Sequence, residues 1–105
     1  LVSKNSNGTL KLNNTSSLLN LKELIISSKF EAWNNEDRFF ENSVSLEVLT
    51  LNNLNLTSAK LESNFNFNFF PNLKKMDLSH NLLDYFPNRI LLHNKLLNYL
   101  NLSHN

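Results

Sequence analysis

Two serine–histidine pairs are the residues of this sequence whose types could do chemistry. Ser79-His80 and Ser103-His104 each offer a nucleophile and a general base. Adjacent residues on a strand point to opposite faces, however, so the two members of a pair would point apart. The carboxylates are scattered, with no spacing that would pair two of them across a cleft. We therefore predict no catalytic residues, and we do not expect the chain to be an enzyme.

Metal, cofactor and nucleic-acid sites are not expected either. His80, His93 and His104 lack a short H-x-x-x-H spacing, and the chain has no cysteine. A single glycine is too few for a glycine-rich phosphate-binding loop. A net charge of +1 with 18% charged residues is too balanced for binding to nucleic acid or a membrane surface. No apolar run approaches the roughly 18 residues of a membrane span, so we expect no membrane contact within this segment. A membrane anchor elsewhere in a longer protein remains compatible with the sequence.

The elements that would position these residues repeat along the chain. The 105 residues include 23 leucines and 21 asparagines, a bias that indicates internal repeats. The segment L-x-x-M-x-L-S-H-N that begins at Leu73 recurs at Leu97 as L-x-x-L-x-L-S-H-N. Looser copies begin at Leu46 and Leu21, so the four starts follow one another at a period of about 25 residues. We predict an irregular flank or partial repeat at 1–20 and about four repeats at 21–105, truncated at the C-terminus.

This pattern resembles the leucine-rich repeat family, whose consensus is L-x-x-L-x-L-x-x-N/C-x-L with a period of about 20–29 residues. In the third copy the match continues through Leu83, Phe86 and Pro87. The period between the last two copies, together with Phe-Pro, is similar to the typical subclass found in extracellular receptors, including the Toll-like receptors. The resemblance implies an α/β fold: a curved solenoid with short parallel strands on the concave face and irregular or helical return segments on the convex face. It also implies binding of a protein ligand or partner subunit.

The x-Leu-x-Leu alternation sorts the strand residues by face without reference to the family. Successive side chains of a strand point to opposite faces, so the leucines point inward and their neighbours point outward. Stacked copies join their leucines into one core. The predicted core and turn residues are Leu73, Met76, Leu78, Asn81, Leu97, Leu100, Leu102 and Asn105. The candidate binding face, concave by resemblance, consists of Lys22, Glu23, Ile25, Glu47, Val48, Thr50, Lys74, Lys75, Asp77, Asn98, Tyr99 and Asn101.

Asparagine at the turn after each strand can bond to backbone groups, and one in each repeat would form a ladder. That position holds Asn81 and Asn105 in the last two copies, but Leu54 in the second and Lys29 in the first. We expect the ladder to break in the first half, unless Asn52, Asn53 or Asn55 substitutes. In the second return segment, phenylalanines alternate with asparagines up to residue 70. This alternation predicts a short strand or an extended segment that buries the phenylalanines.

His80 and His104 occupy the same repeat position, where neighbouring strands would hold their backbones about 4.8 Å apart. Two stacked imidazoles would repel each other when both are protonated, which would give sensitivity at about pH 6. The alternative is a pair of solvated turn residues duplicated with the repeat, because an exposed like-charge pair has little energetic effect.

Five sequons, at Asn7, Asn13, Asn14, Asn55 and Asn101, are candidate glycosylation sites. Chance alone gives about three sequons in a chain so rich in asparagine, so their number is not a significant excess. The resemblance favours the extracellular side of a membrane receptor or a secreted protein. The alternative is a cytosolic scaffold or the regulatory region of a larger intracellular protein. The lack of cysteine fits that alternative, because extracellular repeat arrays usually end in disulfide-bonded caps.

Overall fold

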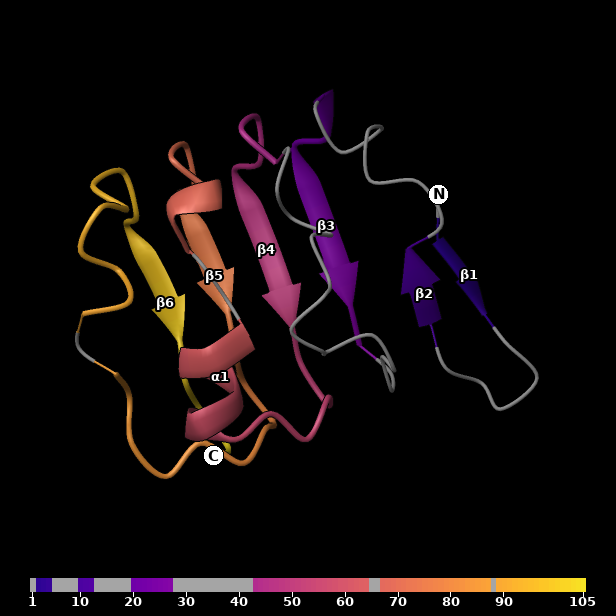
Figure 1. Ribbon diagram of the computed structural model, residues 1–105, viewed down its shortest axis with the longest axis vertical. Coiled ribbons are helices and arrows are strands. Elements are labelled where there is room, and N and C mark those ends of the chain that lie inside the picture. The colour runs from indigo at the N-terminus through magenta and orange to yellow at the C-terminus, as the bar shows by residue number, and fades with distance from the viewer. Residues whose placement is uncertain (1, 5–9, 13–19, 28–42, 65–66, 88) are drawn as a thin grey trace.

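Four short strands form a parallel sheet in the computed structural model, which describes residues 2–4, 10–12, 20–27, 43–64, 67–87 and 89–105. The strands are β3 (Glu23–Ile26), β4 (Val48–Leu51), β5 (Lys75–Asp77) and β6 (Tyr99–Asn101), and they lie in that order (Figure 1). The prediction of short parallel strands is thus confirmed. A separate antiparallel pair joins β1 (Val2–Lys4) to β2 (Leu10–Leu12).

The register of the sheet pairs residues that occupy the same position in each repeat. Glu23, Val48, Lys75 and Tyr99 are neighbours across the four strands. Just before the strands, the carbonyl of Lys22 accepts hydrogen bonds from two consecutive N–H groups at the start of β4, at 2.8 and 3.0 Å. The carbonyls of residues 47 and 74 do the same for the next strand. Each step from one sequence copy to the next therefore becomes a step of one strand in space.

The inward face of the sheet forms the core. In β3 and β4, buried residues alternate with exposed or half-buried ones, as the x-Leu-x-Leu pattern predicts. The core cluster consists of Leu24, Ile26, Leu46, Leu49, Leu51, Leu54, Leu56, Leu61, Phe67, Phe70, Leu73, Met76 and Leu78. Burial of this apolar surface is the main stabilisation of the stack, at about 25 cal/mol for each Å² removed from water.

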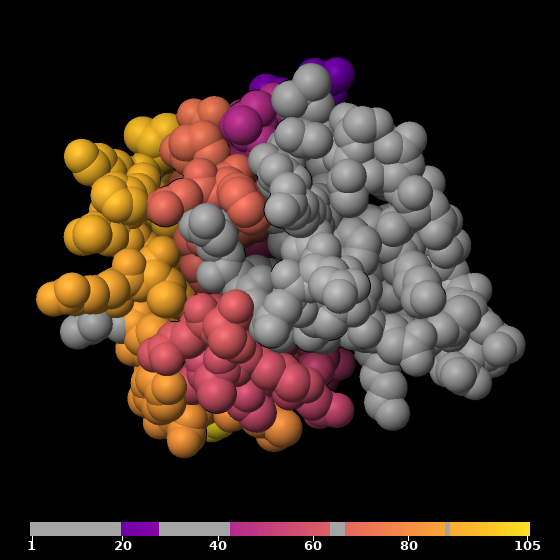
Figure 2. All heavy atoms as spheres, in the orientation of Figure 1, coloured from indigo at the N-terminus to yellow at the C-terminus, as the bar shows by residue number. Residues whose placement is uncertain are grey.

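A helix and a 3₁₀ turn cover this inward face. Helix α1 (Ser58–Asn64) lies in front of the strands in Figure 1, and Leu61 joins its inner side to the core. Thr57 caps its first turn, because Thr57 Oγ1 accepts a hydrogen bond from the N–H of Lys60 at 3.2 Å. The space-filling view from the same side shows α1 at the surface, bordered by the chain that follows β5 (Figure 2). No helix of the described ranges is long and apolar enough to cross a membrane.

The phenylalanine-rich return segment differs from both forms predicted for it. Phe67–Phe69 form the 3₁₀ helix η2, not a strand or an extended segment. A 3₁₀ turn places residues three apart on the same side, so Phe67 and Phe70 are both buried and meet edge to face at 5.9 Å. Asn68 is exposed between them. Phe65 lies outside the described residues.

The last copy is less buried than the third, which corrects the expectation that its leucines are equivalent core residues. Leu73, Met76 and Leu78 are fully buried, whereas the side chain at Leu100 is 38% exposed and Leu97 and Leu102 are only half-buried. β6 lies at the edge of the sheet and has a neighbouring strand on one side only. The edge position alone does not explain the exposure, because β3 is the other edge strand and its inward Leu24 and Ile26 are buried.

Candidate functional site

The outward-pointing residues of the four strands lie together on one face of the sheet, opposite the core. This outward face comprises Lys22, Glu23, Ile25, Glu47, Val48, Thr50, Lys74, Lys75, Asp77, Asn98, Tyr99 and Asn101, each exposed or half-buried. Two large apolar side chains stand free on its edge strands, with Ile25 58% and Tyr99 51% exposed. Exposed aromatic side chains such as Tyr99 are enriched where proteins contact each other, and charged groups are typical of the polar rim around such contacts.

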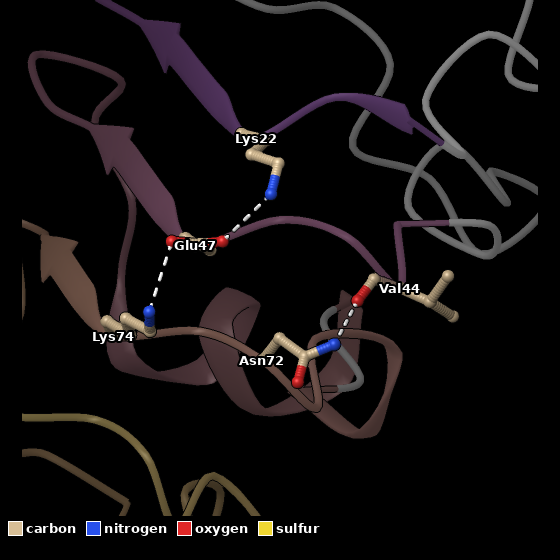
Figure 3. A network of polar contacts seen from close by, with 5 residues as sticks. All are labelled: Lys22, Val44, Glu47, Asn72 and Lys74. Atoms are coloured by element: carbon tan, nitrogen blue, oxygen red, sulfur yellow. Dashed lines mark hydrogen bonds and ion pairs between the residues drawn. The ribbon is translucent and has the colours of Figure 1, made fainter.

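A row of alternating charges crosses the outward face just before the strands begin. Glu47 receives Lys22 Nζ at one carboxylate oxygen and Lys74 Nζ at the other, each at 3.3 Å (Figure 3). These hydrogen bonds and the charges of both lysines hold the pKa of the Glu47 carboxyl below its ordinary value. The carboxylate is therefore a paired anion rather than a proton acceptor. Asn98 continues the row just before β6 without a charge.

A second contact joins the turns that precede β4 and β5. The side-chain amide of Asn72 donates to the backbone carbonyl of Val44 at 2.7 Å, across one repeat (Figure 3). Both residues are exposed. This bond joins the turn that leads into β5 to the turn that leads into β4. It therefore helps to hold the backbone beside Glu47 and Lys74 in place.

Lys75 is the outward-face cation without an ion pair among the described residues. Its register partners are Val48 on one side and Tyr99 on the other. On its strand, Lys75 therefore has an aliphatic residue on one side and an aromatic residue on the other. This arrangement can bind a carboxylate or backbone carbonyl of a partner while the flanking side chains supply apolar contact.

Two residues assigned to the candidate face are already engaged with the backbone. The carboxylate of Asp77 accepts a hydrogen bond from the N–H of Ser79 at 2.9 Å, and the amide oxygen of Asn101 accepts one from Ser103 at 3.0 Å. Each bond closes an Asx turn at the end of its strand. Asp77 and Asn101 thus shape the turns, and the residues before them are freer to meet a ligand.

The asparagine ladder is present in the last two repeats. Asn81 is buried; its Nδ2 donates to the carbonyls of Leu51, Leu78 and Ser79, and its Oδ1 accepts from the N–H groups of Leu54 and Leu56.

Asn105 repeats this pattern one strand later. Its Nδ2 donates to the carbonyls of Leu78, Leu102 and Ser103, and its Oδ1 accepts from the N–H of Leu83. Unlike Asn81, it is exposed.

The second repeat breaks the ladder as predicted, because the buried Leu54 occupies its position. The neighbouring asparagines do not substitute among the described residues: Asn52 Oδ1 is buried without a hydrogen-bond partner, and Asn53 and Asn55 are exposed. Lys29, the first-repeat equivalent, lies outside the described residues.

The two serine–histidine pairs lie just after the ends of β5 and β6 and not on a strand, so the argument from opposite strand faces does not apply to them. Ser79 is buried, whereas His80 is exposed and stacks on His104. Ser103 is exposed on the edge repeat. Within the described part of the chain, no group of three or more histidine, aspartate or glutamate side chains is placed to hold a metal ion.

The two sequons that fall on described residues have different surroundings. Asn55 is exposed in the turn after β4 and has a positive φ of 55°. Asn101 is half-buried within β6 and engaged with Ser103. Asn7, Asn13 and Asn14 lie outside the described residues.

Sequence reasoning missed three polar residues that hold neighbouring return segments together. The hydroxyl of Ser58 is buried at the start of α1, donates to the carbonyl of Tyr85 and accepts from the N–H groups of Asp84 and Tyr85. The amide of Asn94 donates to the carbonyls of Phe67 and Phe70, each at 2.9 Å.

Asn72 is the third of these residues. A signal existed for Asn94 alone, which lies one repeat after Phe70 and so holds a polar side chain at a position that is apolar in the preceding repeat.

Comparison with known proteins identifies no relative of this chain. No protein-family model matches the sequence, and searches of curated proteins and of solved structures found no match.

Proposed function

We propose that this chain is a stretch of a leucine-rich repeat solenoid that recognises a protein through its outward face. In this proposal the sheet lines the concave side of a curved stack, as in the Toll-like receptor ectodomains that the sequence resembles. The parent protein is then a receptor whose ectodomain contains these repeats.

The observation that carries the proposal is the difference in burial between the two faces of the sheet. Every inward position of β3, β4 and β5 is fully used by the core, while the outward face holds Ile25 and Tyr99 more than half exposed. Aromatic side chains in a polar frame are frequent binding anchors. Repeat scaffolds use their extended sheet surface in this manner.

A photo-crosslinking experiment tests the proposal in the intact protein. A photoreactive phenylalanine analogue replaces Tyr99 in one variant and the exposed Lys60 of α1, on the opposite side, in the control. We expect a protein adduct from the outward-face position and none from α1. Adducts of equal yield from both positions, or none from any outward-face position in the cells that make the protein, would overturn the proposal.

A second measurement guards against an error of register. Tyr99→Ala should leave thermal unfolding nearly unchanged while it abolishes the adduct formed from a probe at Lys75, because the Tyr99 side chain is on the solvent side of the sheet. Unfolding as severe as that of Leu78→Ala would mean that the two faces have been exchanged.

The cytosolic scaffold is the second candidate, and the absence of cysteine favours it. The same outward face would then bind an intracellular partner. Glycan occupancy at the sequons distinguishes the two compartments, since N-glycosylation occurs in the secretory pathway.

A further inference from the structure

Two imidazoles face each other at the turns that follow β5 and β6. The rings of His80 and His104 lie with their centroids 4.2 Å apart and their planes 11° from parallel. Both residues are exposed. This separation is somewhat shorter than the spacing of about 4.8 Å between neighbouring strands, so the rings touch face to face.

The backbone holds the two histidines at equivalent positions of neighbouring turns. His80 and His104 both have a positive φ, at 56° and 55°, an uncommon conformation for a residue with a side chain. The N–H of His80 donates to the carbonyl of Ser103 at 3.0 Å, and the carbonyl of His80 accepts the N–H of Asn53 at 3.1 Å. Asn53 holds the equivalent place after β4 with a φ of 57°. The three turns therefore form a second ladder, in which the last two members are histidines.

The described residues place few charged groups on the elements around the stack. Asp77 on β5 is an anion whose carboxylate accepts the N–H of Ser79, and its equivalent on β6 is the neutral Asn101. The turn after β4 carries only asparagine and leucine at 52–55. On the side of α1, the exposed carboxylates are Asp84 and Glu62, and Glu62 interacts with Tyr85.

No ion pair joins either imidazole to a carboxylate among the described residues. The α-carboxylate of Asn105 is the remaining charge near His104 wherever a chain ends at that residue.

We propose that the His80–His104 stack is an acid-sensitive lock between the third and fourth repeats. With both rings neutral, their contact stabilises the junction of the β5 and β6 turns. As the pH falls and both rings become protonated, two positive charges lie 4.2 Å apart, and the junction opens. Separating the two rings relieves this repulsion, so acid favours the opened junction.

The size of the effect follows from the distance. Two unit charges at 4.2 Å in a medium as polar as water repel each other enough to raise the opening constant about fivefold. Because both rings are exposed, the polar medium is the appropriate one. The parts affected first are β6 and the turn that contains Asn105, whose bonds to the third repeat run beside the stack.

Hydrogen–deuterium exchange of the intact protein at pH 7.5 and pH 5.5, corrected for the intrinsic chemical rate, tests the proposal. In wild type, the opening constant of the segment 97–105 should rise severalfold at the lower pH, toward a limit of about fivefold when both rings are fully protonated, while that of 46–56 stays level. His80→Asn and His104→Asn should each abolish the rise. Asparagine suits these turns because Asn53 already adopts the same positive φ. His93→Asn, at an exposed histidine outside the stack, is the matched control and should retain the rise.

Two further arms keep the test decisive. In wild type at about 1 M salt, where charges are screened within about 3 Å, the acid effect should shrink. A neutral extension after Asn105, which moves the terminal carboxylate away from His104, should leave the effect in place. A rise that persists in His104→Asn, that disappears in His93→Asn, or that is absent from wild type would overturn the proposal.

Discussion

Replacing Asn81 by alanine should destabilise the stack more than any other single change at a polar residue. Its side-chain amide makes hydrogen bonds to five backbone groups of two successive repeats, at 2.7 to 3.2 Å. Two of these groups are the N–H donors of Leu54 and Leu56, which belong to buried residues. Alanine offers neither of them an acceptor, and water does not reach them in the closed stack.

The magnitude follows from those two donors. A buried donor left without a partner costs about 1–3 kcal/mol, so the pair costs about 2–6 kcal/mol. The three carbonyls add little to this cost, because an oxygen with two lone pairs tolerates the loss of one hydrogen bond better than an N–H donor does. Since a typical domain is stable by only about 5–15 kcal/mol, the loss is a large fraction of the total.

Asn105→Ala is the matched control, because Asn105 makes the same kind of bonds from an exposed position. Water can replace its partners there, so its loss should reduce the free energy of unfolding by less than that of Asn81. Chemical denaturation of the 105-residue chain measures both changes, and amide exchange at Leu54 and Leu56 locates the damage. Equal losses for the two variants, or unchanged exchange at these amides in Asn81→Ala, would refute the reasoning.

Three more predictions follow from the core, the charged row and the sequons. Leu78→Ala should lower the free energy of unfolding by about 2–5 kcal/mol in denaturant titrations, and Leu102→Ala, which is half-buried, by clearly less; similar values would contradict the difference in burial. Because pairing lowers the pKa of Glu47, its stabilising effect is present above about pH 4.3 and is lost as the pH falls further. The gap in melting temperature between wild type and Glu47→Gln should thus close toward pH 2, and a constant gap would count against the pairing. In protein secreted from its native cells, peptide mapping before and after glycan removal should find Asn55 occupied; unmodified sequons throughout would promote the cytosolic scaffold.

Much of the sheet was predictable because it repeats. The alternation within x-Leu-x-Leu determined which side of the strand each residue takes, and the offset between the copies that begin at Leu73 and Leu97 placed Lys75 opposite Tyr99. The break of the ladder at Leu54 followed from one substitution. These features depend on a residue and its own repeat copy, which sequence comparison within the chain reveals.

The remainder depends on neighbours that the pattern does not encode. Ser58 and Asn94 bond to backbone carbonyls of the adjacent return segments, whose paths differ from repeat to repeat. Leu100 is exposed although its register partner Met76 is fully buried and both hold the same place in the repeat motif. The turn at Phe67–Phe69 replaced an extended segment because burying two phenylalanines three residues apart favours a tight helical turn.

The described junctions between repeats differ in their buried contacts, and we expect this difference to determine which junction opens first. A repeat array is stabilised by each unit and by its contacts with the next, so the weakest junction opens first. The second and third repeats share the buried Asn81 and inward residues that are fully enclosed. The third and fourth share the exposed Asn105, a half-covered Leu100 and the histidine stack. In the proposed lock, acid acts on this second junction, where the described inward residues are less buried than at the first.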